Sequence, residues 1–98
     1  MSQQVTVIAT LHARPGQEAA LEARMRIMIE ATRKEAGCIR YDMHRAADDP
    51  ASLIMVEYWT SAEALQQHDD SSHMAALGRD LPDLVDRPVE VRKFSQVA

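Results

Sequence analysis

Apolar and polar residues alternate along three stretches of the chain, and a period of two is typical of a half-buried β-strand. The alternation runs through residues 4–14, 38–46 and 89–97, which we expect to be strands. Residues 52–59 are rich in β-formers and complete a set of four strands. The turn signal at 48–50 (Asp-Asp-Pro) predicts an antiparallel hairpin between the second and third strands.

A longer period, close to 3.6 residues, follows the first strand. After a break at Pro15-Gly16, residues 17–36 place apolar side chains on one side and mostly charged ones on the other, which predicts an amphipathic helix. Gly37 then stands where a helix C-cap glycine is expected.

Two shorter helices are expected after the third strand. Residues 60–63 (Thr-Ser-Ala-Glu) have the form of a capping box, so a helix should begin directly after that strand and end near His68. Residues 69–72 are polar and suit a helix cap better than a helix interior. A further short helix should therefore start at Ser72 or His73.

The resulting order of elements is β-α-β-β-α-β. It predicts an α+β, ferredoxin-like fold, in which a four-stranded antiparallel sheet carries its helices on one face. The sequence contains no repeat, linker or low-complexity segment, so residues 1–98 are expected to form one domain. A chain of this length is near the lower end of what buries a self-sufficient core, and association with a second copy offsets that deficit.

Apolar side chains occupy both faces of the third expected strand. Alternate positions point to opposite sides, and both sets are apolar: Leu53, Met55 and Trp59 against Ile54, Val56 and Tyr58. A sheet with helices on only one side should have a polar second face. The simplest way to bury an apolar second face is to pack it against the same sheet of a second copy of the chain. We therefore expect a two-fold homodimer with Tyr58 in its interface.

Composition and charge narrow the range of partners. The chain has 11 basic and 15 acidic residues spread without blocks, so a nucleic-acid partner is not expected. No apolar run approaches the ~20 residues that span a bilayer, and residues 1–4 lack the basic start of a signal peptide. The single cysteine, Cys38, excludes an internal disulfide. These features indicate a cytoplasmic protein that does not act on membranes.

Candidate chemistry gathers around the end of the third expected strand. Trp59 is either a stacking wall for a flat aromatic substrate or an anchor of the core or interface. His68 and His73 are candidate general bases, since an unperturbed pKa of ~6.5 suits proton abstraction near neutrality. Alternatively, the two imidazoles lie in solvent and hydrogen-bond to the polar turn at 69–72.

Glu57 lies two residues before Trp59 and therefore on the same strand face. A carboxylate there would be half-buried, with a raised pKa, and could exchange protons with a histidine. The interpretation that we favour is a cross-strand ion pair with an arginine such as Arg14 or Arg45.

Three further residues are candidate substrate contacts. The Tyr41 hydroxyl could bind a substrate oxygen, or its ring could lie in the core, and strand parity leaves both open. Met55 and Met74 occupy core positions and could form a pliable wall that accepts flat ligands. Cys38 follows the expected helix cap without a nearby histidine, so we expect a packed structural thiol.

A metal site is not expected. The spacing of five between His68 and His73 would turn the two imidazoles about 140° apart on one continuous helix. Zinc needs at least a third protein ligand, and only Asp69 and Asp70 are at hand in the sequence.

These elements, in this order and spacing, resemble the antibiotic biosynthesis monooxygenase family of small dimeric α+β-barrel proteins. The resemblance covers nearly the whole chain: the opening strand with Pro15-Gly16, Glu35-Ala36-Gly37-Cys38, Tyr41, Leu53 to Trp59, and His68 with His73-Met74. It implies a pocket between sheet and helices. For many members it also implies oxygenation of quinols, anthrones or similar polyphenols without metal or bound cofactor. Other branches degrade haem, isomerise small molecules or bind signalling molecules.

The chain departs from the better-defined branches at two positions. Haem-degrading members pair the tryptophan of the third strand with an asparagine on the first strand, about where Ala9 stands here. Polyketide-oxidising members carry an asparagine shortly before that tryptophan, near Met55.

From the residues and the resemblance together we expect a cofactor-independent monooxygenase acting on a quinol-like or polycyclic phenol. His68 or His73 would take the phenolic proton, Trp59 would hold the ring, and the resulting anion would react directly with dioxygen. The alternative is a dimer that binds a small ligand or serves in a stress response without catalysis. Haem degradation and isomerisation are the remaining alternatives.

Overall fold

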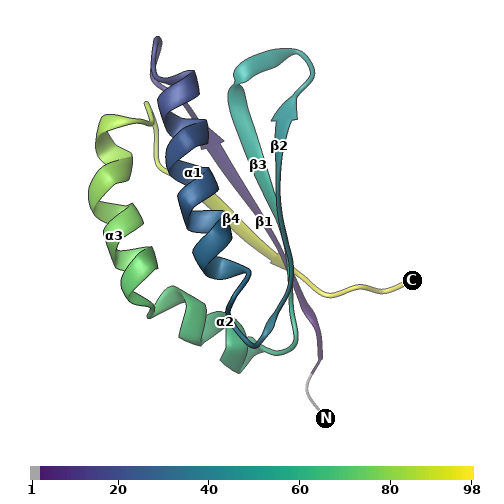
Figure 1. Ribbon diagram of the computed structural model, residues 1–98. Coiled ribbons are helices and arrows are strands. Elements are labelled where there is room, and N and C mark those ends of the chain that lie inside the picture. The colour runs from purple at the N-terminus through teal and green to yellow at the C-terminus, as the bar shows by residue number, and fades with distance from the viewer. Residues whose placement is uncertain (1–2) are drawn as a thin grey trace.

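The computed structural model describes residues 3–98, so residues 1 and 2 of the segment inspected for a signal peptide lie outside the described part. One four-stranded antiparallel sheet, in the order β2-β3-β1-β4, carries all helices on one face (Figure 1). The elements are β1 Val5–His12, α1 Glu18–Thr32, β2 Cys38–Ala46, β3 Asp49–Trp59, α2 Ala62–Asp69, α3 Ser72–Asp80, the 3₁₀ turn η1 Leu81–Asp83 and β4 Glu90–Phe94. The α+β, ferredoxin-like prediction is confirmed.

The core lies between the helices and the two central strands. Alternation along β1 and β3 turns one set of side chains toward the helices, as the sequence predicted: Val7, Ala9, Leu11, Leu53, Met55, Glu57 and Trp59 are all buried. The buried side chains of α1 close this layer from above: Leu21, Met25, Met28, Ile29 and Thr32. Burial of these apolar surfaces is the main force that holds the two layers together.

A β-bulge in β2 decides which way Tyr41 points. Alternation of the sequence placed Ile39 and Tyr41 on one face, but the register shifts between Cys38 and Arg40. The extra residue leaves Ile39 52% exposed, whereas Tyr41 is only 3% exposed on the helix side. Strict alternation therefore does not describe the start of β2, because a bulge resets the parity of a strand.

The first helix is shorter than predicted, and Gly37 has a different role from the one expected. The helix ends at Thr32, and among the described residues only Gly16 has a positive φ. Gly37 is needed for close approach instead, since a Cβ there would collide with the side chain of Ala64 on α2. The backbone at Gly37 consequently lies directly against α2.

The break between α2 and α3 follows the sequence prediction. Ser61 is the N-cap of α2, and its Oγ accepts a hydrogen bond from the Ala64 amide (3.1 Å). Ser71 caps α3 in the same way through the Met74 amide (3.2 Å), and its hydroxyl donates to the His68 carbonyl (2.7 Å). The cap of α2 is one residue later than a Thr60 capping box would place it.

The last strand lies at the edge of the sheet and pairs with β1. Val91 is opposite Ala9 and Lys93 is opposite Val7, so the side chains of Val91 and Lys93 face the helices. No helix in residues 3–98 is both long and apolar enough to cross a bilayer.

Candidate functional site

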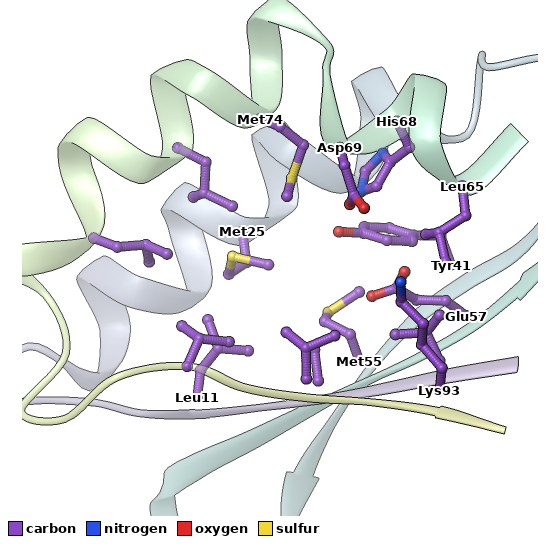
Figure 2. A pocket seen from close by; sticks show the side chains of 16 residues that line it. Leu11, Met25, Tyr41, Met55, Glu57, Leu65, His68, Asp69, Met74 and Lys93 are labelled. Carbon is purple, nitrogen blue, oxygen red and sulfur yellow. The ribbon is translucent and has the colours of Figure 1, made fainter. Parts of the chain in front are cut away.

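A cavity of about 190 Å³ lies between the sheet and the helices. Its walls are mostly apolar and come from every layer, including Leu11, Met25, Met55 and Met74 (Figure 2). The polar side chains gather toward one end, where the third strand leads into α2: Tyr41, Glu57, His68, Asp69 and Lys93. A concave apolar cavity with a few converging polar groups is the usual form of a small-molecule site.

His68 is the imidazole that borders this cavity. The last turn of α2 carries it into the interior, where it is only 2% exposed, so the expectation of a solvated helix end is wrong for this residue. Its Nδ1 lies 2.7 Å from Oε2 of Glu35. In the neutral ring, an Nδ1–H that donates to this carboxylate leaves the lone pair on Nε2. Within residues 3–98, Nε2 has no protein hydrogen-bond partner.

Glu35 is a member of the site that the sequence did not identify as functional. It stands in the segment between α1 and β2, and the close approach at Gly37 brings this segment to α2. Its Oε2 also lies 2.8 Å from Nε2 of His73. His73 does not line the cavity, and its side chain is 28% exposed on the solvent side of the cluster. The two candidate histidines therefore share one carboxylate, but only His68 can reach a ligand in the cavity.

This arrangement corrects the expected divergence of His68 and His73. The helix ends between them and a new one begins at Ser72, so the 140° argument for one continuous helix does not apply. The ligand atoms of Glu35, His68 and His73 all lie within 4.8 Å of one another.

Trp59 supports the site from behind instead of forming its wall. Its side chain is fully buried (0% exposed) and is not among the groups that border the cavity, so the anchor interpretation fits the structure and the stacking wall does not. The indole packs on the His68 ring with centroids 4.6 Å apart and meets Tyr41 edge-on at 6.3 Å. Its Nε1–H donates to Oε1 of Glu57 (3.0 Å). The indole thus positions three polar side chains of the site.

Glu57 lies in the cavity wall and has no arginine partner among the described residues. The expected ion pair is wrong, because Arg14 donates to the Pro82 carbonyl and Arg45 pairs with Glu22. Burial raises the pKa of Glu57 to about 7, with the hydrogen bond from Trp59 opposing and the negative charge of Asp69 adding to the rise. The carboxyl is therefore partly protonated near neutrality and can donate or accept.

Tyr41 borders the same end of the cavity. Burial, reinforced by the charge of Glu57, raises the pKa of its hydroxyl well above the usual range, so it remains a neutral phenol. Its ring meets the His68 ring edge-on at 5.5 Å. Met55 and Met74, the other two expected contacts, both lie in the cavity wall. Cys38 lies outside the wall, and burial raises its thiol pKa, as expected of a packed cysteine.

Comparison with known proteins identifies the family. Residues 4–79 match the antibiotic biosynthesis monooxygenase family. The chain belongs to this family. A Mycobacterium tuberculosis relative named "Putative monooxygenase Rv0793" is 37% identical over 91 residues, which are 93% of this chain and 89% of the relative.

Solved structures of family relatives have the same fold. The structure of Rv0793 superposes with a TM-score of 0.92 at 34% identity, covering 98% of this chain and 97% of that one. PA3566 from Pseudomonas aeruginosa gives the same TM-score and identity, covering 100% of this chain and 98% of the other. The family resemblance drawn from the sequence is confirmed.

The two departures from better-defined branches of this family lie side by side. Ala9 and Met55 are direct partners across the β1–β3 ladder, and both border the cavity. In this family member the centre of the sheet therefore offers a ligand only apolar contact. The polar contacts are confined to the end near His68.

Proposed function

We propose that this protein is a monooxygenase for a quinol-like phenol, with His68 as the base and no cofactor required for the reaction. The observation that carries the proposal is the position of His68. Its Nδ1 is held by Glu35 at 2.7 Å, and its ring borders an apolar cavity. A histidine oriented by a carboxylate is a recurring form of general base, since the carboxylate fixes the tautomer and stabilises the imidazolium that forms.

The chemistry requires little more than deprotonation and a dry cavity. Nε2 of His68 takes the phenolic proton, and the electron-rich anion reacts with dioxygen at a ring carbon that carries a hydrogen. The peroxide anion takes the proton back from His68 and becomes a hydroperoxide. Loss of water from the hydroperoxide leaves a new carbonyl. One oxygen atom of O₂ thus enters the product and the other leaves as water. The apolar walls keep solvent from quenching the anion.

The remaining polar groups suit the second oxygen of a quinol. Tyr41 is a neutral donor and Glu57 is partly protonated near neutrality, so either can hold a hydroxyl or a carbonyl as the reaction proceeds. Lys93 adds a cation at the same end, which favours an anionic substrate.

The cavity size restricts the substrate. An apolar cavity of ~150 Å³ accommodates benzene. A cavity of about 190 Å³ therefore favours a one- or two-ring quinol over a larger polycycle or haem.

The test is oxygen uptake with a panel of monocyclic quinols, menadiol-like naphthoquinols and anthrones. With ¹⁸O₂, the product should carry one labelled oxygen atom. A protein that binds these quinols without oxygen uptake above the uncatalysed rate would contradict the proposal.

A second candidate function is binding of a small aromatic ligand without turnover. The apolar pair Ala9 and Met55 favours it. Haem-degrading members of the family carry an asparagine about where Ala9 stands, and polyketide-oxidising members carry one near Met55. Titration with the same panel under anaerobic conditions, followed by admission of air, separates the two candidates. Binding that is unchanged by air supports the second.

We also propose that the protein acts as a homodimer. On the sheet face away from the helices, four apolar side chains are only half-buried in the protomer: Ile8, Ile54, Val56 and Tyr58. Sedimentation at micromolar concentration should give about twice the chain mass. Tyr58→Asp should dissociate or unfold the protein, since it would bury an unpaired carboxylate. A folded monomer of the unaltered chain would contradict the proposal.

A further inference from the structure

Glu35, His68 and His73 form a cluster whose side chains are common metal ligands. One oxygen atom, Oε2 of Glu35, lies 2.7 Å from Nδ1 of His68 and 2.8 Å from Nε2 of His73. The three side chains come from three different segments, and their ligand atoms lie within 4.8 Å of one another. We propose that Glu35, His68 and His73 bind a divalent transition-metal ion of the zinc type, and that the bound ion switches off His68 as a base.

The donor set selects the class of ion. Two imidazole nitrogens and one carboxylate oxygen suit zinc and its neighbours, whereas calcium and magnesium prefer oxygen ligands alone. Three protein ligands with a water in the fourth position make an open tetrahedral zinc site. Such an ion replaces the two protons that the histidines now donate to Glu35.

The geometry requires only small side-chain movements. A tetrahedral ion at ~2.0–2.1 Å from each ligand holds the ligand atoms ~3.3 Å apart. The two nitrogen–oxygen distances must therefore widen slightly from 2.7 and 2.8 Å, and the two nitrogens, now at most 4.8 Å apart, must approach each other. His73 on the first turn of α3 is the ligand that can move, because its side chain is 28% exposed.

An ion can reach this cluster from solvent without entering the cavity. Glu35 and His73 have side chains 18% and 28% exposed, while His68 is 3% exposed and forms the inner ligand. The Glu35 carboxylate lies between the two imidazoles and supplies the negative charge that a cation requires.

The effect on His68 follows from the chemistry of imidazole. A neutral ring that binds metal through Nδ1 carries its proton on Nε2. That nitrogen then donates a hydrogen bond and cannot accept a proton. Occupancy of the metal site and use of His68 as a base are thus mutually exclusive, and this part of the inference rests on the function proposed above.

The binding test uses Co²⁺ as a spectroscopic probe for the zinc-type ion. Chelator-treated protein titrated with Co²⁺ should develop the visible absorption of a tetrahedral site with a one-to-one end point, and Zn²⁺ should displace it. Glu35→Gln and His73→Gln should each weaken binding at least ~100-fold. His44→Gln, at an exposed histidine of β2, is the matched control and should bind as the unaltered chain does. Circular dichroism checks that each variant is folded.

The proposed metal site would be refuted if millimolar Co²⁺ caused no absorption change. It would also be refuted if His73→Gln bound Co²⁺ as tightly as the unaltered chain, or if His44→Gln lost binding. The switch is tested separately by quinol-dependent oxygen uptake, which should fall at least tenfold when Zn²⁺ fills the site. Undiminished uptake in zinc-saturated protein overturns the switch. Tetrahedral Co²⁺ binding in a protein that never consumes oxygen supports the site and refutes the proposed function, so the two failures are distinguishable.

Discussion

At each end of the paired strands β1 and β3 a histidine lies against carboxylates, and the two arrangements differ in what the second ring nitrogen contacts. His12 has its Nδ1 3.0 Å from Asp86 and its Nε2 3.0 Å from Asp49, so both nitrogens are occupied. His68 has one nitrogen on Glu35 and the other toward the cavity. His12 therefore serves as a clamp, whereas His68 keeps a nitrogen free for a proton.

The surroundings reinforce this difference. The His12 cluster is open to water, with the Asp49 side chain 44% exposed and Arg87 also paired to Asp86. His68 lies under Trp59 and beside Tyr41, shielded from solvent. Charge interactions are screened in the first environment and strong in the second. The same residue type thus supports structure at one end of the sheet and candidate chemistry at the other.

The largest expected effect comes from removing the free nitrogen. His68→Gln should lower quinol-dependent oxygen uptake by ~10²–10⁴-fold, because proton abstraction is lost. His12→Gln is the matched control and should leave the rate unchanged. Raising the pH should partly restore the His68 variant, since the phenol then ionises without a base. Full activity of His68→Gln at neutral pH would refute the role of His68, and Glu57→Gln would become the next variant to test.

Glu57, at the buried end near His68, should also make the stability of the fold depend on pH. The pKa of Glu57 is raised to about 7, so the folded state holds a proton that the unfolded state releases above its ordinary pKa of 4.5. The free energy of unfolding should therefore fall as the pH rises from about 4.5 to about 7, by up to ~3 kcal/mol. Urea unfolding at a series of pH values measures this slope, and Glu57→Gln should flatten it. An unchanged slope in the variant would show that another group is responsible.

The approach of Glu35 to His68 can be broken at Gly37. Gly37→Ala should destabilise the fold by ~1–3 kcal/mol, because the added methyl collides with Ala64 and pushes the segment away from α2. Gly78→Ala is the control, since it meets open space on α3 and should stabilise the helix by ~0.5–1 kcal/mol. Thermal melting of both variants tests the pair. Equal melting temperatures would contradict the steric account.

The smallest effect is expected at the exposed end. The hydrogen bond from the Ala51 amide, followed by that from His12, lowers the pKa of Asp49. Arg87, followed by His12, lowers the pKa of Asp86. This contribution to stability should be lost as the pH falls through those lowered values, on the acid side of the Glu57 slope. Because the groups are exposed, His12→Gln should lower the melting temperature only slightly, and high salt should remove the difference. A salt-independent fall would indicate that packing dominates.

The sequence predicted those features that depend on local pattern. Alternation located β1, a run of β-forming residues located β3, and the polar residues before Ser72 located the break between α2 and α3. The family followed from the same elements. Tyr41 could not be placed, because a bulge is a single-residue change of register that leaves no mark in a count of apolar positions.

The candidate site was less predictable because its members meet through tertiary contacts. Glu35 and His68 are 33 residues apart, and no spacing rule connects them. The arginines expected beside Glu57 found other partners, since a long side chain can reach several carboxylate and carbonyl acceptors on the folded surface. Gly37 was a signal in the sequence, but it was interpreted as a helix cap, whereas the structure shows that it permits a close approach between segments.

The position of β4 has a consequence for how the protein can change over time. This strand follows residue 79, where the match to the family ends, and its side chains are exposed at the edge of the sheet. Yet Val91 and Lys93 form part of the cavity wall. Substitutions there can alter which molecules enter without disturbing the packed interior or the histidine. A chain built in this way can change which ligands its cavity admits by mutation of an exposed edge strand, while the residues around His68 stay intact.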